Sequence, residues 1–159
     1  MRTGAKIFII SMVSVLFCAS LSLARDTRHM FSIKHALEHP EAKAKLNQGV
    51  KFYFGDQAHP EVVQSFGTFT SNRKTNAFGK SDLEACEWAF LGGLVALQER
   101  ALREGGDAVI NIKSYYKKHE ISSEDQYECG AGNVIAGVAL RGSVVKLGGV
   151  AGKRREDEY

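Results

Sequence analysis

The feature that most constrains this fold is a predicted helix over about residues 82–104, the longest regular element in the sequence. Its apolar residues recur at three- and four-residue spacing, which is typical of a helix with one buried face. A helix of this length extends for about 35 Å. The residues of its main apolar stripe are Cys86, Phe90, Leu94, Leu97 and Ala101.

Both ends of this helix carry sequence signals. Ser81 and Glu84 form a capping box, in which the serine hydroxyl accepts an early backbone N–H and the glutamate reaches back. Gly105 and Gly106 end the helix. A second glycine pair, at residues 92–93, lowers helix propensity in the middle. We therefore expect close packing against a neighbour at that pair, with local fraying as the alternative.

The residues just before the helix resemble the end of a phosphate-binding loop. Gly79, Lys80 and Ser81 fit that pattern, but the complete motif needs a glycine at position 74, which is Lys74. The missing glycine leaves the backbone cradle for phosphate unspecified. We interpret Gly79, Lys80, Ser81 and Glu84 as a helix cap with a solvated lysine. Accordingly, no nucleotide is expected, and no other cofactor is indicated.

The rest of the chain alternates between short strands and one further helix. The predicted fold class is α+β: a mixed sheet of about five strands, with the long helix and a short helix packed on it and at least one βαβ-like crossover. The short helix is expected at about 40–47, and a polar loop at 71–80. The expected strands are 30–33, 50–54, 61–71, 108–117, 127–140 and 143–147.

The strand predicted over 108–117 has two different faces. Ile110, Ile112 and Tyr116 fall on one side of the alternation. The other side includes Lys113, Tyr115 and Lys117, which mix basic and aromatic groups. These three residues are a candidate partner-binding strip. The alternative is the ordinary solvated face of a strand.

The first 24 residues have the pattern of a secretory signal peptide. Arg2 and Lys6 give a positive start, residues 7–23 are mainly apolar, and cleavage is expected between Ala24 and Arg25. The run is marginal in length for a membrane span. We therefore expect a periplasmic or secreted protein without a membrane anchor after cleavage. Residues 25–148 would form a single α+β domain, followed by a disordered, charged tail at 149–159.

Removal of the predicted signal peptide changes the net charge and the number of cysteines of the mature protein. The chain has 21 Lys and Arg against 18 Asp and Glu, and loss of Arg2 and Lys6 leaves it close to neutral. This balance gives no electrostatic case for nucleic-acid binding. Cys18 is lost with the signal, so Cys86 and Cys129 remain as an even pair, expected to form a disulfide worth about 4 kcal/mol. Two separate buried thiols are the alternative.

Two further patterns have part of the spacing of known binding sites. Gly130 and Gly132 lack the third glycine of a dinucleotide motif, so we interpret them as a strand bend that lets the backbone approach the Cys86 helix closely. His35 and His39 have a spacing that two metal ligands on a helix can use. Pro40 disfavours helical geometry at His39, so exposed histidines are the preferred interpretation and no metal is predicted.

Five segments of the chain are similar to parts of a known family: 50–55, 75–82, 105–116, 127–132 and 137–140. They resemble small exported proteins of Gram-negative bacteria, some of which carry the label "excinuclease ATPase subunit". More distantly, the arrangement of helix and strands is similar to the lipoprotein sensor of the Rcs envelope-stress pathway and to small oligomeric domains called heavy-metal-binding. The resemblance implies an α+β sheet crossed by a long helix. The chain lacks the lipid-attachment motif of the sensor and has fewer cysteines.

These observations predict a soluble, non-enzymatic periplasmic protein that binds an unidentified protein partner or itself, in envelope maintenance or stress. No catalytic residues are singled out by the sequence. The alternative is a small periplasmic redox or hydrolytic enzyme. A nucleotide-binding protein of the excinuclease ATPase type is less favoured, because the phosphate-loop pattern is incomplete.

Overall fold

The computed structural model of the protein describes residues 25–46 and 49–148. The predicted signal peptide and the charged tail lie outside the described residues. Along the chain the elements are β1 (Thr27–Ser32), α1 (Ile33–Glu38), α2 (Pro40–Lys45), β2 (Lys51–Phe54), β3 (Val62–Asn76), α3 (Asp82–Glu104), β4 (Ala108–Ser114), the 3₁₀ turn η1 (Tyr116–Lys118), β5 (Gln126–Ala131) and β6 (Ile135–Leu147).

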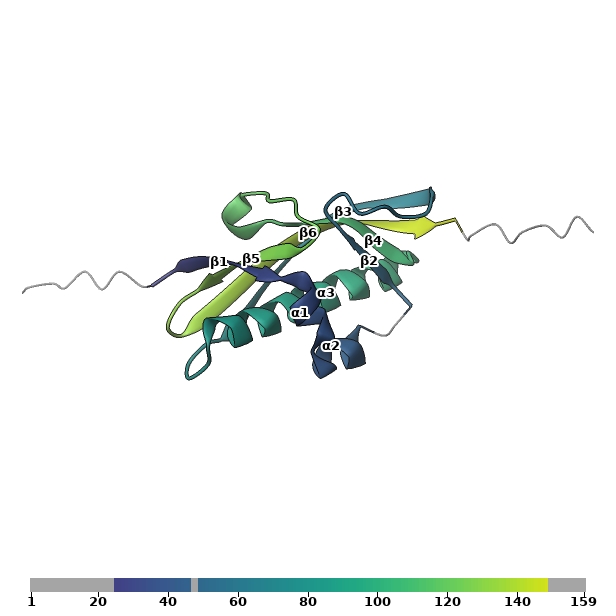
Figure 1. Cartoon of the computed structure of the whole chain (residues 1–159). Coiled ribbons are helices and arrows are strands. Elements are labelled where there is room, and N and C mark those ends of the chain that lie inside the picture. The colour runs from purple at the N-terminus through teal and green to yellow at the C-terminus, as the bar shows by residue number, and fades with distance from the viewer. Residues whose placement is uncertain (1–24, 47–48, 149–159) are drawn as a thin grey trace, which may run out of the picture.

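The strands form one curled, mixed sheet, which confirms the predicted α+β class (Figure 1). Strand β6 lies at the centre of the sheet. Strand β3 pairs along one edge of β6, while β5 and β4 pair with different parts of its other edge. Strand β1 extends the sheet beyond β5, and β2 extends it beyond β4. Among the described strands, only β2 and β4 pair in parallel. The crossover connection between them contains both β3 and α3.

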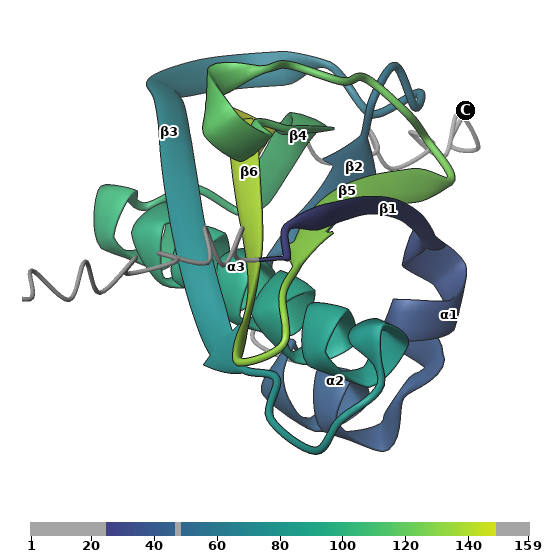
Figure 2. The same ribbon diagram turned by 90° about the vertical axis from the view of Figure 1, so that its left-hand side faces the viewer.

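Helix α3 lies across one face of the sheet and has the bounds predicted for it (Figure 2). The Ser81 hydroxyl accepts a hydrogen bond from the Glu84 backbone N–H at 3.1 Å, and Gly105 ends the helix in the left-handed conformation. The close packing expected at residues 92–93 is confirmed at Gly93. A Cβ atom there would lie 3.1 Å from Leu140, tighter than an ordinary contact.

The predicted disulfide is present and joins α3 to β5. Cys86 and Cys129 are fully buried, their Cα atoms are 5.9 Å apart, and their sequence separation is 43 residues. Beside the bridge, the rings of Phe90 and Tyr127 stack with centroids 4.0 Å apart. The bridge therefore fastens the long helix to the sheet inside the main apolar core.

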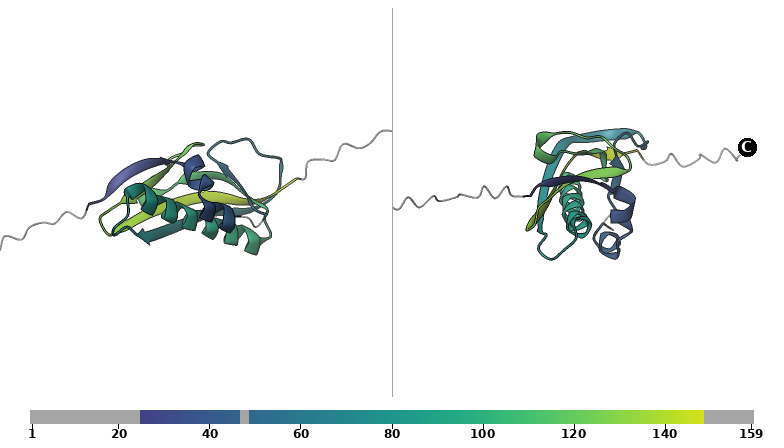
Figure 3. Two further views of the ribbon diagram at one scale, coloured as in Figure 1. Left: turned by 60° about the horizontal axis from the view of Figure 1, so that its bottom comes forward. Right: turned by 60° about the vertical axis from the view of Figure 1, so that its left-hand side comes forward.

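The N-terminal segment contains more structure than the sequence predicted. The expected short strand is the longer β1, and the short helix expected at 40–47 is α2, preceded by α1, which was not predicted. His39 separates the two helices in an extended conformation, as expected for a residue before proline. Both helices lie beside α3 (Figure 3). Ile33 and Ala36 of α1 are buried in the main core.

The prediction of a polar loop at 71–80 is wrong for the first half of that range, because β3 continues to Asn76. Thr70, Asn72 and Lys74 are exposed and gave no apolar alternation to detect. The backbone of β3 nevertheless pairs with β6 from one end of the strand to the other, from Val62 opposite Leu147 to Asn76 opposite Ile135. This part of β3 is therefore held by pairing with a strand that is distant in the sequence, and not by a local pattern of side chains.

The strand predicted over 127–140 is two antiparallel strands, β5 and β6, joined by a tight turn after Gly132. The short strand expected at 143–147 is the end of β6. The interpretation of Gly130 was also wrong. A Cβ atom at Gly130 would lie 2.0 Å from the Tyr116 hydroxyl, so the glycine makes room for Tyr116 rather than for the Cys86 helix.

Candidate binding site on the open face of the sheet

The face of the sheet opposite α3 is the more open one. In Figure 1 the α-helices lie on one side of the sheet, whereas η1 lies on the other. The apolar cluster on this second face is small, and it is built from Ala108, Ile110, Val145 and Leu147. This arrangement leaves much of the open face to polar side chains.

A polar cleft occupies the middle of this face, where β3, β6 and β4 run side by side. We call it the open-face cleft. The strand register places Thr68 opposite Ser143, and both Thr70 and Lys113 opposite Arg141. The Thr68 and Ser143 hydroxyls share a hydrogen bond of 2.8 Å. The lining residues are Asp56, Thr68, Asn111, Lys113, Glu120, Arg141 and Ser143.

Asn111 lies at a β-bulge within β4. Its φ is 51°, a left-handed conformation that glycine adopts freely and that most L residues other than asparagine and aspartate avoid. The bulge interrupts pairing with β6 between Ile110 and Lys113. As a result Ile110 belongs to the open-face cluster, while Ile112 points into the main core. The prediction that Ile110 and Ile112 share a face is therefore wrong.

Charges of both signs meet at the cleft. The Lys113 ammonium donates to Glu120 Oε1 at 2.9 Å, and the Arg141 guanidinium lies 4.0 Å from Glu120 Oε2. The hydrogen bond from Lys113 lowers the pKa of the Glu120 carboxyl, and the charge of Arg141 acts in the same direction. The Arg141 guanidinium also lies over the Tyr115 ring, 5.1 Å from its centroid.

The structure divides the strip predicted from Lys113, Tyr115 and Lys117. Lys113 lines the cleft, and Tyr115 lies at its edge under Arg141. Lys117 turns away, because β4 ends at Ser114 and the chain continues into η1. The three residues therefore do not share one strand face. The sequence pattern missed the bulge and the turn, both of which break the alternation.

Lys117 instead joins a separate cluster around the start of β1. It forms an ion pair with Asp26, and the Tyr116 hydroxyl donates to the same carboxylate at 2.9 Å. The hydrogen bond from Lys117 is the main cause that lowers the pKa of Asp26, and Tyr116 contributes further. Burial, together with the bond to Asp26, raises the pKa of Tyr116 to about 12. This cluster fixes the point where the chain enters the sheet.

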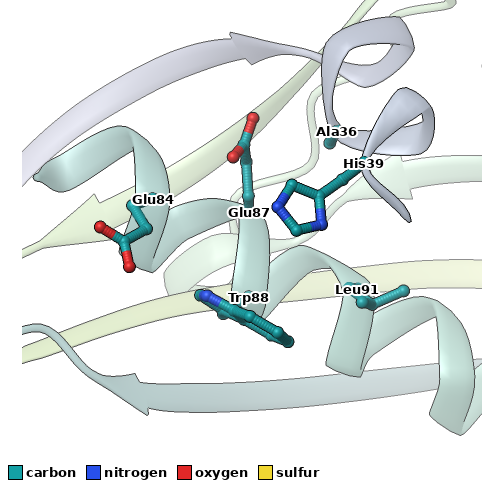
Figure 4. Close-up of a pocket in the computed structure, with 6 residues that line it drawn as sticks. All are labelled: Ala36, His39, Glu84, Glu87, Trp88 and Leu91. Atoms are coloured by element: carbon teal, nitrogen blue, oxygen red, sulfur yellow. The ribbon is translucent and has the colours of Figure 1, made fainter. Parts of the chain in front are cut away.

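A small pocket lies between the two short helices and α3 (Figure 4). The His39 and Trp88 rings meet edge to face there, with centroids 5.9 Å apart. His35 does not join them: its Nδ1 lies 2.5 Å from Glu87 Oε1. The two histidines thus have different partners. Among the described residues, no three His, Cys, Asp or Glu side chains gather in a group suited to a metal ion.

The residues that resemble a phosphate-binding loop have local roles here. Gly79 has a φ of 73° in the turn before α3, and Ser81 caps the helix. The Lys80 ammonium donates to the backbone carbonyl of Asn76 at 3.0 Å. The lysine ammonium is therefore bonded within its own loop.

Most of the cleft was not predicted from the sequence. Lys113 and Tyr115 were singled out, but Asn111, Arg141 and Ser143 were not. A usable signal exists in the second half of β6, where the polar residues Arg141 and Ser143 follow an apolar stretch at two-residue spacing.

No family model, curated protein or solved structure was found to match this chain. Within the part of the chain that the structure describes, no helix has the length and apolar character needed to cross a membrane.

Proposed function

We propose that the protein is an exported, non-enzymatic binding protein that contacts its partner through the open-face cleft. The observation that carries the proposal is Asn111, an exposed residue in a left-handed conformation at the wall of a polar cleft. A β-bulge re-aims side chains, and bulges are over-represented next to functional sites. The export signal and the resemblance to envelope proteins motivate a place in the cell envelope.

The chemistry of the cleft favours a polar segment of another protein. Lys113, Arg141 and Glu120 present both signs of charge, and each side chain is about a third exposed or more. Ion pairs of this exposure contribute little to stability. They can therefore exchange for pairs with a partner at low cost. The hydroxyls of Thr68 and Ser143 add neutral hydrogen-bonding groups beside them.

The environment of the cysteines supports a structural rather than a redox role. Reactive cysteines are partly exposed and lie in electropositive surroundings. Cys86 and Cys129 are instead buried among apolar side chains. This burial argues against the alternative of a periplasmic redox enzyme that uses these two cysteines.

Site-specific crosslinking in intact cells tests the proposal. A photo-crosslinking amino acid at Asn111 should capture a discrete partner, whereas the same group at Glu99, on the exposed side of α3, should not. Substitution of Lys113 and Arg141 by glutamate should abolish that capture while leaving the thermal unfolding midpoint within a few degrees. Equal capture at both positions, or capture that survives the double substitution, would overturn the proposal.

A further inference from the structure

Strand β3 lies at one margin of the sheet, and its outer edge is open (Figure 2). Its partner among the described strands is β6, on the inner edge. Within the described part of the chain, no backbone hydrogen bond other than those of the β6 ladder reaches β3 between Gly67 and Thr75. Every second residue of an edge strand directs its N–H and C=O away from the sheet. This stretch therefore presents a row of unpaired backbone groups.

The open stretch is short and lacks the features that usually protect a sheet edge. Such edges are blunted by bulges, prolines and charged residues. The bulges of β3 lie before Thr68, and residues 68–72 contain neither a proline nor a charge. Beyond the stretch, the Lys80 ammonium already bonds to the Asn76 carbonyl. Residues 68–73 can therefore accept a short additional strand.

A hollow beside this edge is formed by β3 and the second half of α3. Residues of both alternating sets of β3 line it, from Phe69 to Arg73, so it opens on the edge of the strand and not on one face alone. Figure 2 shows the last turns of α3 extending past β3 at this margin. A strand added about 5 Å from β3 would direct every second side chain towards these turns. The lining residues from α3 are Ala96, Leu97, Glu99, Arg100 and Arg103.

The hollow is basic, because three arginines line it against one carboxylate, that of Glu99. Arg100 already has a partner, since its Nε lies 2.7 Å from Glu104 Oε1. The other two arginines, Arg73 and Arg103, form no ion pair with an acidic residue of the described chain. Two cations at the rim of the hollow therefore remain for a ligand, and charge complementarity favours an acidic one.

We propose that the free edge of β3 binds a short, acidic peptide as an added strand. Backbone hydrogen bonds supply affinity in this mode of recognition, and alternate side chains supply specificity. Carboxylates at every second position of the peptide would meet Arg73 and Arg103. A free peptide also brings a terminal carboxylate, which an internal segment of a folded protein lacks. A second copy of the chain fits less well, because it would bring the same arginines to the contact. The hollow shares no lining residue with the open-face cleft.

A peptide titration on protein purified from cells that express the full chain tests the proposal. The probe is a fluorescein-labelled peptide in which threonine and glutamate alternate. We expect saturable binding, which Arg73→Glu combined with Arg103→Glu should weaken about tenfold. The matched control, Lys113→Glu with Arg141→Glu, reverses the same number of charges in the open-face cleft and should leave the affinity unchanged. A peptide with glutamine in place of glutamate should also bind about tenfold more weakly.

Two backbone-methylated peptides test the strand pairing itself. In a strand, alternate N–H groups point to opposite edges, so methylation of either the threonine or the glutamate amides, but not of both kinds, should abolish binding. Amide exchange followed by NMR should slow at every second residue of 68–73 when the unmethylated peptide is bound. Absence of binding, equal affinity of the two methylated peptides, or equal loss in the two double variants would overturn the proposal. Protection of the same amides that rises with protein concentration alone would also overturn it, and would assign the edge to a second copy. A protein crosslinked at Glu99 in cells would overturn it in favour of a protein partner.

Discussion

The two faces of the sheet are made by the same strands but have opposite character. In β6, Leu140 and Val144 point into the core beneath α3, while Arg141 and Ser143 point into the open-face cleft. The covered face is apolar and holds the disulfide. The open face carries exposed ion pairs and a left-handed residue. The contrast indicates that one face supplies the stability and the other is free to hold groups that cost stability.

Loss of the disulfide should have the largest effect. Replacing Cys86 and Cys129 by alanine should lower the free energy of unfolding by about 4 kcal/mol, because the denatured chain regains the freedom of a long loop. Urea titrations of the oxidised protein and the double variant measure this difference. If the loss is no larger than that of an open-face substitution, the bridge does not anchor the covered face.

Neighbouring residues of β6 give the most direct comparison of the two faces. Leu140→Ala should cost about 3 kcal/mol, because Leu140 is 1% exposed and fills the space beside Gly93. Arg141→Ala, one residue further on, should cost less than about 1 kcal/mol. Chemical denaturation of the two single variants compares them. Equal losses would contradict the assignment of different roles to the two faces.

A substitution at Tyr127 should raise the free energy of unfolding rather than lower it. Its hydroxyl is buried and has no hydrogen-bond partner among the described residues, and burial raises the pKa of this phenol. Tyr127→Phe should therefore raise the free energy of unfolding by about 1 kcal/mol, since it removes an unpaired polar atom and keeps the ring stack with Phe90. Tyr115→Phe on the open face is the matched control and should change little. A less stable Tyr127→Phe protein would show that the hydroxyl has a favourable partner.

The bulge at Asn111 can be examined in the same way. Asn111→Gly should leave stability within about 0.5 kcal/mol, since glycine adopts positive φ freely. Asn111→Val should lower it by about 1 to 2 kcal/mol, because a β-branched residue is strained there. Thermal unfolding of both variants measures the difference. A valine variant as stable as the glycine variant would argue against a left-handed conformation at this position.

The last comparison is a pH dependence at Tyr116, whose hydroxyl is bonded to Asp26. Its folded pKa of about 12 lies above the ordinary tyrosine value of 10.0, so the protonated phenol stabilises the fold below pH 10. That contribution should disappear as the pH rises from about 10 to about 12. The stability difference between the native protein and Tyr116→Phe should therefore shrink over this range in denaturation experiments. A constant difference would mean that Tyr116 does not titrate differently in the folded state.

Local signals predicted the parts of the fold that depend on one segment. The bounds of α3 follow from Ser81 and Gly105, and the Cys86–Cys129 pair follows from the even cysteine count outside the predicted signal peptide. The end of β3 and the β5–β6 hairpin were missed, because they depend on pairing between distant segments. The cleft was only partly predicted for the same reason. Lys113 carries a local pattern, but Arg141 reaches the site through the register of β4 on β6.

The bridge between Cys86 and Cys129 also has a mechanical consequence. Strand β4, which carries Asn111 and Lys113, lies wholly between the two cysteines in the sequence. A pulling force applied to both ends of the domain passes directly across the two sulfur atoms and bypasses that strand. While the bond is intact, stretching can detach β1 or peel β3 from β6, but it cannot extend the chain segment that contains β4. Tension along the polypeptide therefore does not act on β4, the strand that carries Asn111 and Lys113 of the cleft.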